Sequence, residues 1–296
     1  MGVLDMPNDV IPVLLDTDIG SDIDDAVALA YLLRQPRCEL LGVTTVSGDV
    51  QQRAALVKIL CASAGRDDIP IHCGRRGVFA GGPGQPNVPQ YVRVSHHTHR
   101  LDRPENTAVQ FLQETIRSRP GEIVLLSIGP FGNIATLLAL DPEIPALLRG
   151  FVSMAGKFSE PDYAEWNCRV DPVATAVAYS HCGPGHVSVG LDVTLACVLP
   201  ADEIRLKFAK PGLEIVSEMA EVWFSHSEFL TFHDPLAAAL IFHPELCELA
   251  QGAVEIVIGE GTDRDGITLF TPGAGKQFIC RSVESSVFFE KYFAVF

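Results

Sequence analysis

Short, almost continuously apolar runs alternate with segments of helical periodicity, and this alternation restricts the chain to few folds. The apolar runs cover residues 11–15, 40–46, 123–129, 151–156 and 186–193. Apolar residues at helical spacing follow over 24–35, 50–65 and 133–140. Buried parallel strands have such sequences, because helices cover both faces of their sheet. We therefore predict an α/β fold with a mostly parallel open sheet, helices on both faces and an active site at the carboxyl ends of the strands.

Two segments interrupt the alternation. Residues 74–104 are rich in Gly, Pro and His, and a loop of that length in a compact domain is commonly functional or disordered. We interpret its histidines His96, His97 and His99 as loop residues, because calcium does not select imidazole ligands. Residues 221–232 have the composition of an aromatic-rich helix. The sequence contains no internal repeat and no long charged linker, so we expect a single domain over residues 1–296.

Charge and composition exclude several classes of function. The net charge of −15 argues against a nucleic-acid or anionic membrane surface, since both need clustered Lys and Arg. No apolar run approaches the ~18 residues of a membrane span. The eight cysteines have no metal-ligand spacing, which predicts buried free thiols in a reducing compartment. The first ten residues also lack the features of a signal peptide, so we expect a cytoplasmic protein.

The stretch DTDIGSDIDD, between the first apolar run and the first helical segment, concentrates negative charge. Its five aspartates are Asp16, Asp18, Asp22, Asp24 and Asp25. Helix capping explains only Asp24 and Asp25, which would favour the positive end of a helix dipole. A calcium loop of the EF-hand type needs Gly and Glu at the positions that Ser21 and Val27 occupy. A hard-cation site completed by distant residues accounts for the crowding.

Polar residues also follow the later apolar runs. They are Ser47–Asp49, Gly129–Asn133, Ala164–Asn167 and Leu191–Thr194. The carboxyl ends of parallel strands lie along one edge of a sheet, so these groups should converge on the aspartate stretch. This convergence of residues more than a hundred positions apart favours an enzyme.

The Asp-x-Asp pair directly after a strand is also similar to phosphotransferases of the haloacid-dehalogenase type. Asp16 would then be the nucleophile and Asp18 a general acid, with magnesium bound. Gly20 stands where that pattern has Thr or Val, and the pattern gives no role to the Asp24–Asp25 pair. A magnesium-dependent phosphohydrolase stays open as one alternative, and a non-catalytic ligand-binding protein with a metal site as another.

Six motifs, in order along the chain, resemble the inosine–uridine-preferring nucleoside hydrolase family. They are Asp16–Ala26, Thr44–Gly48, Ile128–Ala135, Ala164–Asn167 with Asp171–Pro172, Leu191–Thr194 and His233–Pro235. The resemblance extends over most of the chain. It implies a Rossmann-like nucleoside hydrolase fold and hydrolysis of the N-glycosidic bond of ribonucleosides, with ribose and a free purine or pyrimidine base as products. It also suggests a homodimer or homotetramer.

The same resemblance implies a metal site and two catalytic groups. One calcium ion per subunit would be held by Asp18, Asp25, Asp234 and the backbone carbonyl of Gly132. It would also bind two ribose hydroxyls and the attacking water, since the oxocarbenium-like transition state needs a positioned nucleophile. Asp18 would be the general base. His233 would protonate the leaving base, which its ordinary pKa of about 6.5 allows.

The remaining implied residues surround the substrate. Substrate contacts would come from Asp24, Asp49, Glu165, Trp166 and Asn167, while Asp16 would orient the loop from behind. Base-pocket candidates, which could stack on the base, are Trp166, Trp223, Phe224, Phe229 and Phe232. Four departures concern the sugar and base. Asp22 belongs to a two-residue expansion and has no assigned role, and Asp49 stands where Asn is usual. The loop before Glu165 has Ser159 and Asp162 where an Asn that contacts the sugar is often found, and residues 74–104 lack the usual His-Gly segment. They therefore bear on substrate identity rather than on the metal site.

Overall fold

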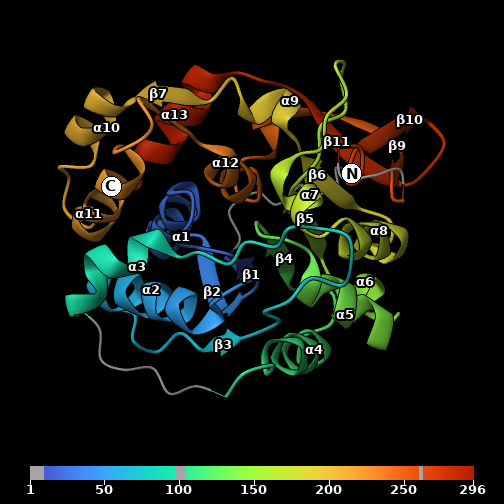
Figure 1. The fold of residues 1–296 in the computed structure, drawn as a ribbon, viewed down its shortest axis with the longest axis horizontal. Coiled ribbons are helices and arrows are strands. Elements are labelled where there is room, and N and C mark those ends of the chain that lie inside the picture. Colours follow the sequence, from blue (N-terminus) through green and yellow to red (C-terminus); the bar gives the residue numbers. More distant parts are fainter. Residues whose placement is uncertain (1–9, 98–103, 260–262) are drawn as a thin grey trace.

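A nine-stranded sheet forms the centre of the molecule (Figure 1). The structure is a computed structural model that describes residues 10–97, 104–259 and 263–296. The strands are β1 (Ile11–Thr17), β2 (Cys38–Thr45), β3 (Ile71–Cys73), β4 (Val124–Ser127), β5 (Gly150–Met154), β6 (His186–Val189), β9 (Cys247–Ile256), β10 (Thr268–Pro272) and β11 (Gln277–Val283). Their order is β10-β9-β11-β6-β5-β4-β1-β2-β3. Pairing is parallel from β3 to β11, and β9 pairs antiparallel with both of its neighbours.

Helices connect most of the parallel strands. The helices that follow the early strands are α1 (Asp24–Arg34), α2 (Val50–Ser63), α3 (Pro89–Val94), η1 (Ser95–His97), α4 (Ala108–Ser118), α5 (Gly132–Leu140) and α6 (Ile144–Leu147). The later ones are α7 (Trp166–Val170), α8 (Pro172–His181), α9 (Leu191–Thr194), α10 (Ala201–Lys207), α11 (Glu214–Trp223), α12 (His233–Leu240), η2 (Pro244–Leu246) and α13 (Ser285–Phe293).

The sheet is covered on both faces, as its apolar strands predict. Along β1, Val13 and Leu15 belong to one buried cluster and Leu14 to the other, because successive strand side chains point to opposite faces. The first cluster includes residues of α1, α2 and α12, and the second includes residues of α4, α5 and α8. Figure 1 shows these two groups of helices on opposite sides of the sheet. The predicted fold class is confirmed.

Two sequence predictions of local structure are wrong. Residues 221–232 are not one helix, since α11 ends at Trp223 and β8 (Phe229–Thr231) pairs antiparallel with β7 (Val198–Pro200). The hydroxyl of Ser225 donates to the carbonyl of Val222 over 2.7 Å, and the indole of Trp223 donates to the carbonyl of Phe229 over 2.9 Å. These bonds stabilise a turn in place of further helix. Residues 74–104 are also not wholly irregular, because they contain α3 and η1; His99 lies outside the described residues.

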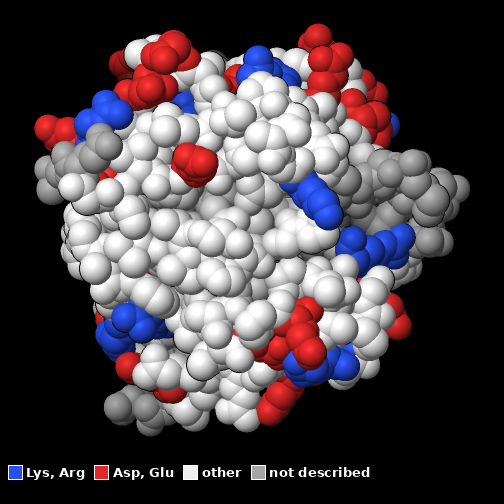
Figure 2. Space-filling view, turned by 90° about the vertical axis from the view of Figure 1, so that its right-hand side faces the viewer, with Lys and Arg blue, Asp and Glu red and all other residues white. Residues whose placement is uncertain are grey.

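The buried positions of most cysteines agree with the apolar segments in which they occur. None of the eight cysteines forms a disulfide, and only Cys38 is more than slightly accessible. In the part of the chain that the structure describes, no helix is long and apolar enough to cross a bilayer. Figure 2 shows the face on the β10 side, where acidic and basic side chains are interspersed around the margin and the centre carries little charge.

Candidate functional site

A cavity of about 570 Å³ opens beyond the carboxyl ends of β1, β4 and β5. Its walls come from the β1–α1 loop, residues 85–89, the residues after β4 and β5, and the segment between α11 and α12. Its volume falls in the usual range for small-molecule sites. The predicted site residues that line it are Asp18, Asp24, Asp25, Glu165, Trp166, Asn167, His233 and Asp234. The structure therefore brings together predicted groups from three separate segments of the chain, residues 18–25, 165–167 and 233–234.

Three carboxylates form the floor of this cavity. Oxygen atoms of Asp24, Asp25 and Asp234 all lie within 4.8 Å of one another, and each residue is buried. Asp24 and Asp25 open α1, and Asp234 is in the first turn of α12, so both helices direct their positive ends to the cluster. The hydroxyl of Thr17 donates to Oδ1 of Asp25 over 2.5 Å and fixes that carboxylate.

Burial raises the pKa of these groups. The pKa values of Asp24, Asp25 and Asp234 stand well above the ordinary range, first through desolvation and then through the charges of neighbouring carboxylates. Desolvation also raises the pKa of Asp18, while the Arg53 guanidinium opposes that rise. A divalent cation among these oxygens would stabilise their ionised forms. An all-oxygen donor set of this kind suits calcium or magnesium.

Gly132 does not lie where the sequence motif suggested. It is the first residue of α5, its carbonyl accepts the Thr136 hydroxyl over 2.8 Å, and it is not among the lining residues. Ile128 lines the cavity instead. The strand register pairs Asp16 with Ser127, so Asp18 comes beside Gly129, where an added Cβ would stand 2.9 Å from Oδ1 of Asp18. Ile128, the residue before Gly129, therefore comes at the end of β4 on the cavity side, next to the segment that carries Asp18.

Asp49 and Asp16 also lie outside the lining of the cavity. Asp49 is the N-cap of α2, where its Oδ1 accepts the backbone N–H of Gln52 over 3.1 Å. Asp16 is fully buried and accepts the Thr44 hydroxyl over 2.5 Å and the Asn133 amide over 2.7 Å. Desolvation raises the pKa of Asp16 to about 7. Its position behind the loop gives it no access to a substrate.

Glu165 and Asn167 are held rigidly in the opposite wall. Glu165 caps α7, and its carboxylate accepts the backbone N–H groups of Asn167 at 2.8 Å and of Cys168 and Gly156 at 3.2 Å. Burial raises the pKa of Glu165, which these hydrogen bonds partly offset. The amide of Asn167 donates to the Ile128 carbonyl over 3.0 Å and so ties this wall to β4.

His233 closes the cavity on the α12 side. Its Nδ1 lies 2.7 Å from the hydroxyl of Thr194. Burial lowers the pKa of His233 to about 4, because the charged imidazolium loses its hydration. At neutral pH the ring is therefore neutral, and a neutral imidazole can still donate one N–H to a ligand.

Aromatic groups form the open rim. Trp166 is 48% exposed, and the rings of Trp223 and His226 meet edge to face with centroids 5.0 Å apart. Tyr163 lines the same rim beneath the Lys157 ammonium, 4.8 Å from the ring centroid. Of the five predicted base-pocket aromatics, Trp166 and Trp223 line the cavity, while Phe232 is fully buried in the core.

Arg53 is the main site residue that the sequence analysis missed. It is fully buried on α2, and its guanidinium donates to the carbonyls of Ser47 at 2.7 Å, Ile19 at 2.9 Å and Gln85 at 2.8 Å, and also to that of Asp18. Three loops around the cavity are thus bound to one side chain. Its position three residues after Val50, on the apolar face of the helix, was the available signal.

Comparison with known sequences identifies relatives over most of the chain. The family model described as inosine-uridine preferring nucleoside hydrolase matches residues 13–290. A non-specific ribonucleoside hydrolase, RihC of Klebsiella pneumoniae, is 33% identical over 279 residues, covering 88% of this chain and 88% of that protein. A probable uridine nucleosidase of Oryza sativa subsp. japonica is 29% identical over 266 residues, covering 82% and 77%.

Solved structures share the architecture. A plant nucleoside hydrolase superposes with a TM-score of 0.82 at 22% identity, covering 97% of this chain and 98% of that one. A purine-preferring ribonucleoside hydrolase from Gardnerella vaginalis gives 0.76 at 21% identity, covering 96% and 97%. At these identities the likeness shows the fold, and it agrees with the predicted parallel sheet.

Proposed function

Because the chain belongs to the inosine-uridine preferring nucleoside hydrolase family, and is thus a hydrolase of N-glycosidic bonds, we propose that it is a calcium-dependent ribonucleoside hydrolase. The products would be ribose and the free base. The observation that carries this proposal is the position of Asp18 beside the Asp24–Asp25–Asp234 cluster, in one cavity with Glu165 and His233. One cavity of small-molecule size is thus surrounded by residues that can bind a hard cation, residues that can bind a sugar and a residue that can donate a proton.

The family is generally metal-dependent, and the acidic residues of the cavity fit a calcium ion. We assign Asp18, Asp25 and Asp234 as its carboxylate ligands, with the Ile128 carbonyl in place of that of Gly132. When bound, the cation supplies positive charge that holds sugar hydroxyls and increases the acidity of a nearby water.

The protein's own groups supply the rest of the reaction. Asp18 accepts a proton from the attacking water, while Asp24, Glu165 and Asn167 hold the ribose hydroxyls. Holding the sugar this way favours the flattened, oxocarbenium-like transition state. His233 donates an N–H to the departing base from the other side of the cavity, and Trp166 and Trp223 offer faces on which that base can stack.

The phosphohydrolase alternative needs Asp16 as a nucleophile. Its carboxyl group is fully buried against Thr44 and Asn133, outside the cavity lining, so it has no path to a phosphoester.

The relatives are named for different substrates. One is a non-specific ribonucleoside hydrolase and another is a probable uridine nucleosidase. We therefore propose that both purine and pyrimidine ribonucleosides enter the cavity.

A panel of ribonucleosides, incubated with and without a chelator, tests the proposal by release of reducing sugar and free base. Cleavage that stops with chelator and returns with calcium is expected. Asp18→Ala should lose both bound calcium and activity. His233→Ala should retain calcium and lose about 10²–10⁴-fold in kcat. Full activity of Asp18→Ala, or release of phosphate from a phosphoester that Asp16→Asn abolishes, would overturn the assignment.

A further inference from the structure

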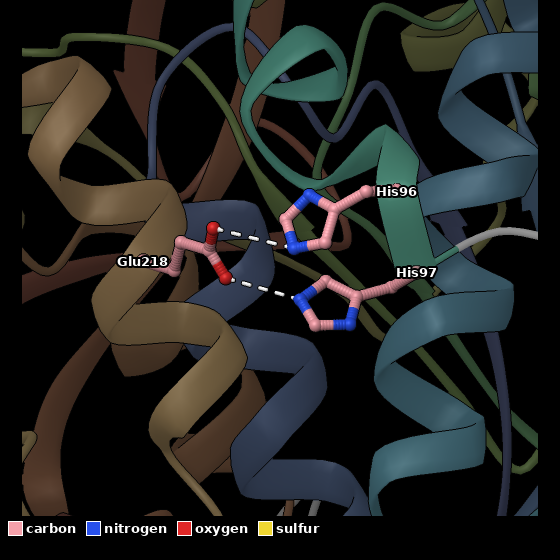
Figure 3. Close-up of side chains that lie close together, drawn as sticks. All are labelled: His96, His97 and Glu218. Carbon is pink, nitrogen blue, oxygen red and sulfur yellow. Dashed lines mark hydrogen bonds and ion pairs between the residues drawn. The ribbon is translucent and has the colours of Figure 1, made fainter.

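Two histidines and a glutamate from different elements meet on the surface beside the cavity. His96 and His97 are in η1, and Glu218 is on α11 (Figure 3). Nε2 of His97 lies 3.1 Å from one carboxylate oxygen, and Nε2 of His96 lies 3.9 Å from the other. The two imidazole rings lie next to each other, with centroids 4.0 Å apart. Both rings therefore direct a nitrogen to the same carboxylate.

We propose that His96, His97 and Glu218 bind a first-row transition-metal ion of the zinc class and so link η1 to α11. Two imidazole nitrogens and one carboxylate oxygen are a donor set that zinc uses where it keeps an open position for water. Imidazole also suits copper and nickel, whereas calcium and magnesium prefer oxygen. The imidazole nitrogens of these histidines do not suit calcium, but they suit transition metals.

The distances permit coordination after small side-chain rotations. The three ligand atoms lie within 4.8 Å of one another. Zinc bonds of about 2.0–2.2 Å place tetrahedral ligands roughly 3.3 Å apart. The side chains retain 61%, 37% and 27% exposure for His96, His97 and Glu218, so they can rotate and leave access for a water ligand. Such an exposed three-ligand site should be weaker than a buried four-ligand site.

One charged neighbour opposes metal binding. Nε of Arg93 lies 3.8 Å from a Glu218 oxygen, and this guanidinium must turn away when a cation binds. The Arg93 side chain is 56% exposed, so it can regain hydration in solvent, and exposed ion pairs of this kind contribute little. The Arg93 guanidinium therefore lowers the affinity of the site for metal but does not prevent binding.

The position of the cluster gives metal binding a structural consequence. Pro89, which begins α3 next to η1, lines the cavity, and so does Trp223, which ends α11. A metal bridge between His97 and Glu218 would join the two elements that carry these walls. The all-oxygen cluster at the cavity floor selects a different class of cation, so the two sites can be filled separately.

Calorimetric titration of the full-length protein with zinc chloride, in millimolar calcium, tests the proposal. The His96→Gln/His97→Gln double variant should bind zinc at least about tenfold more weakly than the native protein at this site. His243→Gln is the matched control, because Nδ1 of His243 lies 3.3 Å from Glu245 in a surface pair with one histidine. It should bind zinc as the native protein does. An unchanged zinc isotherm in the double variant would overturn the site.

Hydrogen exchange measures the link between the elements and separates this site from the cavity. Zinc should slow amide exchange in residues 89–97 and 214–223 of the native protein and of Asp234→Asn, which removes a proposed calcium ligand. It should leave exchange in the double variant unchanged. If zinc binds to the native protein and exchange in these segments does not change, η1 and α11 are not linked by metal.

Discussion

The backbone N–H of Asp234 donates to Oδ2 of Asp24 over 3.1 Å, across 210 positions of sequence. This bond joins the start of α12 to the start of α1, so the carboxylates at the cavity floor are positioned as one unit by two helix N-termini. Each helix directs its positive end at the cluster, which reduces the repulsion among the buried acids. The remaining charge has to be balanced by protons or by a cation.

Asp234→Asn should therefore lose calcium while preserving the shape of the site. The amide has the same size as the carboxylate but carries no charge, and ligand charge sets calcium affinity. We expect calcium binding at least about tenfold weaker and kcat/KM lower by more than about a hundredfold. Calorimetry with calcium and release of base from a ribonucleoside measure the two effects. Native calcium affinity in this variant would remove Asp234 from the ligand set.

Substitutions of Asp49 distinguish a role in capping α2 from a role in binding the substrate. The structure places it at the N-cap of α2, where Asn and Asp cap equally well. Asp49→Asn should leave kcat/KM and thermal stability within about twofold and about 1 °C of native values. Asp49→Ala should lower the free energy of unfolding by about 1 kcal/mol. A large rise in KM for Asp49→Asn would restore the substrate role that the sequence motif suggested.

Asp16 should make the calcium-free protein less stable as pH rises. Its folded pKa of about 7 exceeds the ordinary value of 3.8, so the folded state binds this proton more tightly. Its contribution is complete below pH 3.8 and is lost as pH rises to about 7, by roughly 4 kcal/mol. Urea unfolding in chelator at several pH values should show this decrease. Asp16→Asn should reduce the slope; an equal slope in both proteins contradicts the assignment.

Much of the fold follows from the apolar runs, because a strand buried on both faces leaves few polar positions. The same logic locates Asp18, Asp24 and Asp25, which come directly after β1 at the edge where ligands bind. The sequence does not show which backbone carbonyl faces the cluster. We propose Ile128 in place of Gly132 because the β1–β4 register, a property of the sheet, decides which residues come beside Asp18.

The type of a residue also does not show which role it has when two roles use the same group, such as a carboxylate that caps a helix and a carboxylate that lines the cavity. Asp49 caps a helix and Glu165 caps another, but only Glu165 lines the cavity. The difference depends on where each helix begins relative to the cavity, which local sequence does not encode. The sequence likewise predicts helix after Trp223, where the structure has strand β8, because the pairing of this strand with β7 is a long-range contact.

Arg53→Lys should weaken the site without touching the substrate. Lysine keeps the charge but lacks the planar fork that reaches the carbonyls of Ser47, Ile19 and Gln85 together. Losing two or more of these buried hydrogen bonds should lower the free energy of unfolding by about 2–4 kcal/mol. Because the Asp18 loop also loses an anchor, calcium affinity and kcat/KM should each decrease at least about tenfold.

Arg66→Lys is the control for Arg53→Lys, since Arg66 pairs with Asp68 on the surface at 2.9 Å and should tolerate the change. Calcium calorimetry below the unfolding transition separates a displaced loop from a general loss of stability. A loss of stability with native calcium affinity would make Arg53 a structural residue alone. A decrease in both means that one buried guanidinium positions Asp18, the proposed calcium ligand and general base.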